Sequence, residues 1–179
     1  MRTLVVALIG VVAFASGVML GFELDRDARV VQVEQPQMGD VVEGPPRQVW
    51  LTRSQLQLAA ESGDYEKLRA LIPDAGFEYT FGGPVEGGPI AYWQGLESER
   101  PPIEILAQIL RMPYTLSRGY YVWPFAYDVA SIGDLSPHER ELLEPLGPLD
   151  SLFFAGTGYL GWRAGIAPDG SWAFFVAGD

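Results

Sequence analysis

The end of the chain alternates apolar and mixed positions in the way that a β-hairpin does. The apolar set is Leu160, Trp162, Ala164 and Ile166, and the intervening set is Tyr159, Gly161, Arg163 and Gly165. Pro168-Asp169-Gly170 then predicts a turn, because proline presets φ and Gly170 tolerates the left-handed conformation. Trp172, Phe174 and Val176 repeat the alternation, which places them on one face of the returning strand. Two such strands are not stable alone, so upstream elements must cover one face.

Helical signals begin near Val49. Thr52 and Gln55 fit a capping box for a first helix, which Gly63 should end. Asp64 should cap a second, short helix over residues 65–72.

Later helical segments start at prolines or at a second capping box. Pro89 can open a helix that carries Ile90 and Trp93, and Pro101-Pro102 precede Ile103, Leu106, Ala107 and Leu110 at the spacing of a buried face. Ser136-Pro137-His138-Glu139 predict the start of a further helix.

The remaining ordered segments favour strands and one loop. Residues 77–81 alternate like a half-buried strand, and residues 119–123 read as a strand that Pro124 closes. Residues 82–89 are a glycine-rich loop without the Lys-Ser/Thr pair of a phosphate-binding loop. Helices, a strand, helices and a closing hairpin predict an α+β fold.

The N-terminus predicts a membrane anchor or a signal peptide. Residues 4–22 carry no charge and are long enough to span a bilayer, whereas Ala13-Phe14-Ala15 fits a cleavage site. We therefore divide the chain into residues 1–22 as anchor or signal, 23–47 as a flexible stalk and 48–179 as the α+β domain. The domain is expected outside the cytoplasm, either on a single membrane span or secreted or periplasmic after cleavage near Ala15. Gly17 and Gly21 form a small-xxx-small pair through which two anchors could dimerise.

The composition of the chain argues against several classes of function. Twenty-three acidic residues against 12 basic ones give a net charge of −11, which disfavours nucleic-acid binding. The chain has no cysteine and one histidine, so disulfides, thiol catalysis and ordinary zinc sites are not expected. We predict no metal and no cofactor.

Residues 59–72 followed by residues 77–81 resemble the opening of NTF2-like (SnoaL/cystatin-like) domains: a helix, a Gly-Asp turn, a short helix and a strand. The closing hairpin is similar to the long C-terminal strands of that family. The resemblance implies a cone-like antiparallel sheet with covering helices. The chain also resembles uncharacterised exported bacterial proteins that carry Tyr-x-Trp-Pro and a terminal Trp-x-Phe-Phe-Val-Ala-Gly-Asp. Neither resemblance supplies a catalytic residue.

The densest aromatic run, residues 120–128, has two interpretations. Dense aromatics usually form core, because they bury much apolar area. The alternative is an aromatic-walled pocket that includes Trp123 and Tyr127, with Asp128 at its edge as an acid, base or hydrogen-bond acceptor. A carboxylate buried beside rings holds its proton more tightly, which suits proton transfer.

Arg163 is the candidate anion-binding residue. Alternation places it beside Tyr159 on a face with two glycines, which leaves room for a ligand such as a carboxylate. The alternative is an exposed arginine paired with one of the many acids. Trp93 is subject to the same core-or-pocket ambiguity. His138, the only histidine, lies in a first helical turn and is the second weak catalytic candidate beside Asp128.

Three functions follow from these features. The first is a binding or interaction module with an aromatic pocket, held at the membrane through residues 4–22. The second is a metal-independent hydrolase or isomerase of a small organic acid that uses Asp128 with Arg163. The third is a structural subunit of an envelope complex. The sequence names neither the ligand nor the partner.

Overall fold

The structure, a computed structural model, describes residues 44–96 and 100–178, and these lie in one unit of the chain. The predicted anchor or signal helix, the cleavage position near Ala15, the Gly17–Gly21 pair and residues 23–43 of the stalk lie outside the described residues. Among the residues that are described, no helix has the length and apolar character needed to cross a membrane.

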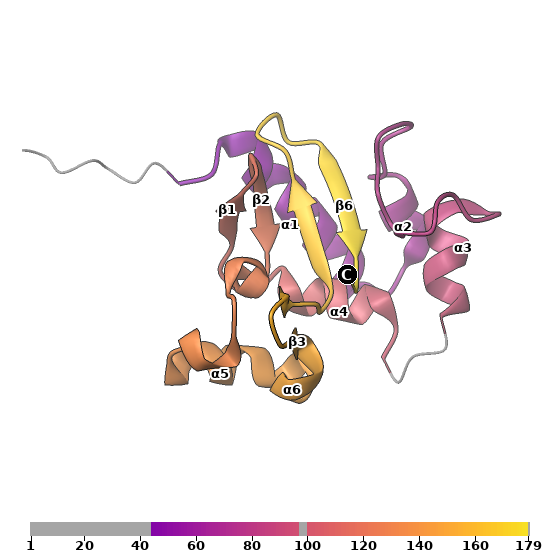
Figure 1. Ribbon diagram of the computed structural model, residues 1–179. Coiled ribbons are helices and arrows are strands. Elements are labelled where there is room, and N and C mark those ends of the chain that lie inside the picture. The colour runs from indigo at the N-terminus through magenta and orange to yellow at the C-terminus, as the bar shows by residue number, and fades with distance from the viewer. Residues whose placement is uncertain (1–43, 97–99, 179) are drawn as a thin grey trace, which may run out of the picture. The chain divides into compact units, whose positions relative to one another are not determined.

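A four-stranded antiparallel sheet holds the fold together, with its strands in the order β1-β2-β5-β6 (Figure 1). The strands are β1 Thr115–Ser117, β2 Tyr120–Trp123, β5 Arg163–Ile166 and β6 Trp172–Val176. The predicted hairpin is β5–β6, and its turn is closed by the Gly170 amide, which donates to the Ala167 carbonyl at 2.9 Å. Helices and an antiparallel sheet together confirm the α+β class.

A bulge in the hairpin overturns the predicted face of β6. Arg163 pairs with Val176, Ala164 with Phe175, Gly165 with Phe174 and Ile166 with Trp172. Ala173 is therefore an extra residue, and an extra residue shifts the alternation by one position. Trp172 and Phe175 occupy the core face, whereas Phe174 and Val176 face the other way. The sequence predicted Trp172 on the same face as Phe174 and Val176, and this prediction is wrong.

The helices lie where the sequence predicts them, but several of them differ from the prediction in length. They are α1 Arg47–Glu61, α2 Tyr65–Arg69, α3 Gly88–Gly95, α4 Pro102–Ile109, α5 Pro137–Leu143 and α6 Leu149–Leu152. Short 3₁₀ helices cover Phe125–Asp128, Ile132–Asp134 and Glu144–Leu146. A second, two-stranded sheet pairs β3 Phe153–Phe154 with β4 Gly158–Tyr159.

The first predicted capping box is wrong, because α1 begins earlier. Pro46 occupies the N-cap position and Thr52 lies inside the helix. The Thr52 hydroxyl instead donates to the Gly170 carbonyl at 2.6 Å, which ties α1 to the turn of the hairpin. The other caps are confirmed: Asp64 accepts from the Glu66 amide, and Ser136 forms a full capping box at the start of α5.

The strand predicted over residues 77–81 is reduced to a single parallel bridge between Glu78 and Phe174. The Glu78 amide donates to the Ala173 carbonyl at 2.9 Å, and the Phe175 amide donates to the Glu78 carbonyl at 3.0 Å. Alternation alone could not show that only one residue of the segment reaches the edge of the sheet.

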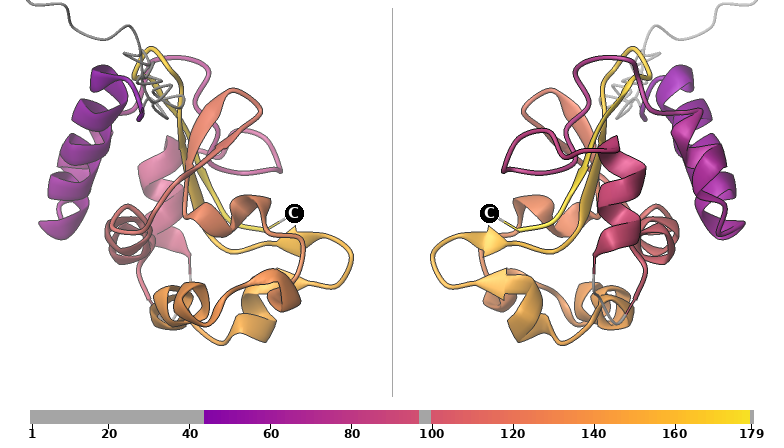
Figure 2. Two further views of the ribbon diagram at one scale, coloured as in Figure 1. Left: turned by 90° about the vertical axis from the view of Figure 1, so that its left-hand side faces the viewer. Right: turned by 90° about the vertical axis from the view of Figure 1, so that its right-hand side faces the viewer.

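The main core lies between the sheet and helices α1 and α4. It contains the fully buried rings of Trp93, Trp123, Trp172 and Phe175, together with Leu56 and Leu106 from the helices. A smaller core joins α5, α6 and the β3–β4 pair around Leu143, Phe153 and Tyr159. Figure 2 shows α1 on one side of the sheet and the β3–β4 pair on the other. That second side carries the candidate site.

Candidate functional site

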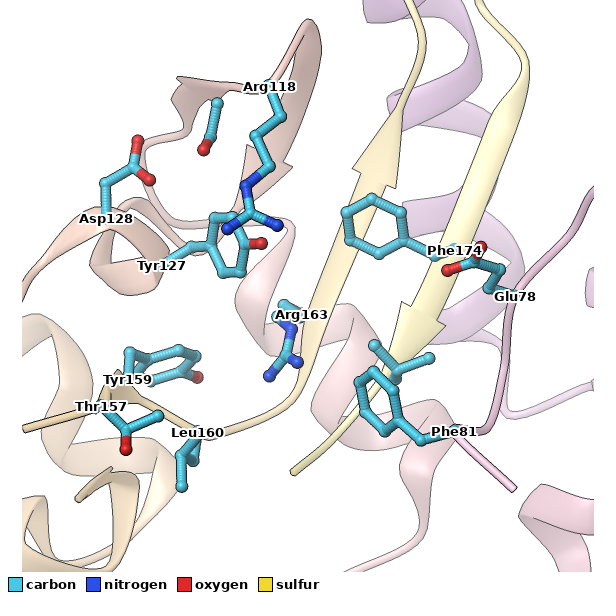
Figure 3. Close-up of a pocket in the computed structure, with 12 residues that line it drawn as sticks. Glu78, Phe81, Arg118, Tyr127, Asp128, Thr157, Tyr159, Leu160, Arg163 and Phe174 are labelled. Carbon is cyan, nitrogen blue, oxygen red and sulfur yellow. The ribbon is translucent and has the colours of Figure 1, made fainter. Parts of the chain in front are cut away.

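A cavity of about 460 Å³ opens on the sheet face opposite the main core. Its lining includes Arg163 and Phe174 from the β5–β6 hairpin, Tyr159 from β4, Tyr127 from the 3₁₀ helix after β2, and Phe81 from the segment beside β6 (Figure 3). The volume falls in the range of small-molecule sites. Sequence-distant segments thus bring aromatic rings and a cation to one hollow.

Arg163 is a buried charged residue in the wall of this cavity. Its side chain and backbone are only 8% exposed, and no other charged residue in residues 44–96 and 100–178 is classed as buried. The guanidinium carbon lies 5.4 Å from the centre of the Phe81 ring and 5.5 Å from that of Tyr127. Nη1 also donates a long hydrogen bond of 3.4 Å to the Gly161 carbonyl. Two ring faces stabilise a cation that would otherwise be costly to desolvate.

Tyr159 forms the floor of the cavity and belongs to the smaller core as well. Its hydroxyl donates to the Trp162 carbonyl at 3.0 Å. Burial raises the pKa of Tyr159 well above its ordinary value, and the nearby positive charge of Arg163 lowers it by less. The phenol therefore stays protonated at neutral pH, so Arg163 faces a neutral hydroxyl and not a phenolate.

The two glycines of the cavity face do not leave empty space, contrary to the sequence prediction. A Cβ on Gly165 would lie 2.1 Å from the Phe174 ring, and one on Gly161 would lie 2.4 Å from the Tyr159 hydroxyl. The rings fold over the bare backbone and become walls of the cavity. Because these glycines have no Cβ, the two rings can pack directly on the backbone. The open volume of the cavity lies on the far side of the rings.

The predicted site residues separate into two groups. Arg163, Tyr159, Tyr127 and Asp128 line the same cavity. Trp93 and Trp123 are each 1% exposed and lie in the main core, so the core interpretation holds for these two. Trp123 is the last residue of β2 and Tyr127 lies in the 3₁₀ helix that follows, and the two rings lie on different sides of the sheet.

The two catalytic candidates are both exposed. Asp128 accepts a hydrogen bond of 2.9 Å from the Thr115 hydroxyl at the rim of the cavity, so the buried carboxylate considered in the sequence is not present. His138 lies on α5, outside the cavity, and its Nδ1 is 3.9 Å from the Glu141 carboxylate.

Several lining residues are not among the predicted site residues, and Glu78, Phe81, Arg118 and Phe174 are the ones that matter most for the chemistry of the cavity. Phe174 was assigned to the wrong face because of the bulge. Glu78 and Phe81 lie in the segment that pairs with β6 through one residue only, and that pairing has no sequence signal. Arg118 stands before Gly119 between two strands, and this Arg-Gly pair was the available sign of a hairpin turn.

Within the part of the chain that the structure describes, no three histidine or acidic side chains gather closely enough to hold a metal ion. Comparison of the chain with protein-family models, with curated proteins and with solved structures finds no significant match. The cavity is therefore the feature of the described residues that bears on function.

Proposed function

We propose that this domain is a binding module for a small molecule with an anionic group, which Arg163 binds in the aromatic cavity. The observation that carries the proposal is the placement of a nearly buried guanidinium at the wall of a cavity of about 460 Å³. A fold that needed only a filled core would gain more from an apolar residue here, because burying a charge is unfavourable.

The surroundings of Arg163 suit recognition of a carboxylate. The guanidinium presents paired N–H groups that match the two oxygens of a carboxylate, and such bonds strengthen where water is excluded. Phe81 and Tyr127 lie against the guanidinium, at 5.4 Å and 5.5 Å from its carbon, and hold it at the wall of the cavity. Phe174 supplies an apolar wall for the remainder of the ligand.

The test is ligand binding to the full chain, measured by thermal shift and calorimetry with a panel of small carboxylic acids. We expect Arg163→Met to lose binding by at least about tenfold, because a hydrogen-bonded charge contact contributes about 1.5–3 kcal/mol. Arg163→Lys should bind with intermediate affinity, since it keeps the charge but not the paired donors.

The matched control is Arg69→Met, which removes an exposed arginine on α2 that pairs with Glu66. It should bind like the unchanged protein. A cooperative thermal transition of Arg163→Met, measured beside binding, shows that the variant is folded. Carboxylate binding that survives in Arg163→Met would contradict the proposal.

A metal-independent hydrolase or isomerase is the second function, and the observation in its favour is that Asp128 and Arg163 line one cavity. The two functions are separated by turnover. An enzyme would convert a bound acid, and Asp128→Asn would abolish conversion while binding persists. Binding without conversion in both proteins supports the module.

We also propose, from the sequence, that the domain works outside the cytoplasm, anchored through residues 4–22 or released by cleavage near Ala15. Protease protection in whole cells and the mass of the mature chain test the two alternatives. An envelope-protein partner is the remaining proposal. The exposed leucines of α1, Leu51 and Leu58, support a contact surface there.

The NTF2-like assignment likewise stays a proposal. Its support is an antiparallel sheet that has helices on one face and a cavity on the other. An experimental structure that shows a strongly curved sheet wrapped around the cavity would agree with the family, and a flat sheet would not.

A further inference from the structure

Arg118 stands in an unusual backbone conformation at the tip of the β1–β2 hairpin. Ser117 pairs with Tyr120, so Arg118 and Gly119 form a two-residue turn. Their φ values are +50° and +85°, the signs of a type I′ turn. Among the described residues, Arg118 is the one non-glycine residue with positive φ.

This conformation is unfavourable for arginine. The left-handed region suits glycine and asparagine, because the Cβ of other L-residues crowds the backbone there. A type I′ turn is best served by Asn-Gly, so the turn alone does not account for an arginine at this position. Strained backbone in native structures gathers at functional sites.

The side chain of Arg118 extends from the hairpin tip over the candidate site. Arg118 lines the main cavity and also a neighbouring cavity of about 210 Å³, which shares Glu78, Tyr127 and Phe174 with it. Figure 3 shows its guanidinium beside the Tyr127 ring, on the same hollow that Arg163 reaches from β5. Arg118 is exposed, so its arm can adjust to a ligand at the mouth of the cavity.

Two guanidinium groups, one from the β1–β2 turn and one from β5, thus line one hollow. Positive groups that line one concave site raise the local concentration of anions there. Glu78 and Asp128 also line the cavity, but within the described part of the chain neither forms an ion pair with Arg118. Asp128 is instead engaged by the Thr115 hydroxyl.

We propose that Arg118 is a second anion-binding residue of this site and that the ligand is a small dicarboxylate, held by Arg163 at one end and by Arg118 at the other. The inference rests on the proposed function, since it assumes that Arg163 binds one anionic group. The carbon chain of the ligand would lie against Tyr127 and Phe174.

The test compares acids of equal length by calorimetry on the full chain: butyrate with succinate, hexanoate with adipate, and octanoate with suberate. We expect one dicarboxylate to bind at least about tenfold more tightly than its monocarboxylate partner, from one added charged hydrogen-bonded contact. In Arg118→Asn this preference should disappear while monocarboxylate binding stays. Arg118→Lys should keep part of the preference.

A second readout separates recognition from a structural role. Arg118→Asn should raise the Tm of the ligand-free protein by about 2–4 °C, because it puts the favoured residue before Gly119. A variant that is more stable and yet has lost the dicarboxylate preference cannot owe that loss to misfolding.

The outcomes distinguish the two proposals. Equal binding of mono- and dicarboxylates, or a preference that persists in Arg118→Asn, overturns the role of Arg118 but leaves Arg163 as the anion-binding residue. If no carboxylate binds, or if Arg163→Met binds all of them normally, the proposed function fails and this inference fails with it.

Discussion

The two faces of the central sheet are made by alternate residues of the same strands, yet they are filled in opposite ways. On one face, Ala164, Ile166, Trp172 and Phe175 pack into a core that is closed by α1 and α4. On the other face, Arg163, Gly165, Phe174 and Val176 are neighbours in the same ladder, and no helix of the main core covers them.

On the proposed function, this difference assigns stability and ligand binding to different positions of the same strands. The filled face gains from area buried and from close packing. The cavity face keeps a charge, rings and open volume, which are features that small-molecule sites often combine. Neighbouring residues of one strand should therefore respond to mutation in different ways.

The largest predicted effect is on the filled face. Phe175→Ala should lower the free energy of unfolding by about 3–5 kcal/mol, because it removes a fully buried ring. Phe174→Ala, one residue earlier and partly exposed, should cost clearly less and should weaken ligand binding. Urea denaturation of both variants measures the contrast. Equal losses would show that the two faces are not energetically distinct.

A smaller effect should arise where the faces meet at the bulge. Gly165→Ala puts a methyl group into the Phe174 ring, so the ring must move. We expect a cost of about 1–3 kcal/mol from overpacking, together with altered binding as the wall shifts. Denaturant unfolding gives the first quantity and calorimetry gives the second. Gly95→Ala in α3 is the control, because nothing lies within 4 Å of that Cβ.

The smallest predicted effect concerns pH and the cavity floor. Burial raises the pKa of Tyr159, so the folded protein keeps this proton where the unfolded chain, with a tyrosine pKa near 10.0, loses it. Stability from this group is complete below pH 10 and declines as the pH rises above it.

Tyr159→Phe should lose about 1 kcal/mol at neutral pH, since the hydrogen bond to the Trp162 carbonyl is gone. The same variant should show a shallower loss of Tm as the pH rises above 10. Burial also raises the pKa of Tyr65, so part of the alkaline loss of stability should remain in the variant. An identical alkaline decline in both proteins would contradict a buried Tyr159.

Local signals in the sequence predicted much of this fold. The Pro168-Asp169-Gly170 turn, the stop at Gly63 and the capping box of Ser136 and Glu139 are all found, because each depends on a few adjacent residues. The extra residue at Ala173 and the single bridge at Glu78 depend on pairing between distant segments, and no local pattern encodes them.

Residues of the candidate site could be predicted from the sequence only where strand alternation applied. Alternation placed Arg163 and Tyr159 on one side, and the structure brings both to the cavity, although Tyr159 belongs to a separate small sheet. Aromatic residue type did not distinguish wall from core: Tyr127 lines the cavity, whereas Trp93 and Trp123 are packed inside. That distinction depends on three-dimensional packing.

The bridge at Glu78 has a consequence for how this site can diversify. Its backbone amide and carbonyl close the edge of β6, a task that almost any residue other than proline can perform. Its side chain lines both cavities. Descendants of this chain can thus exchange the side chain at this position, and with it the chemistry of the cavity wall, while the sheet edge stays protected from pairing with other chains.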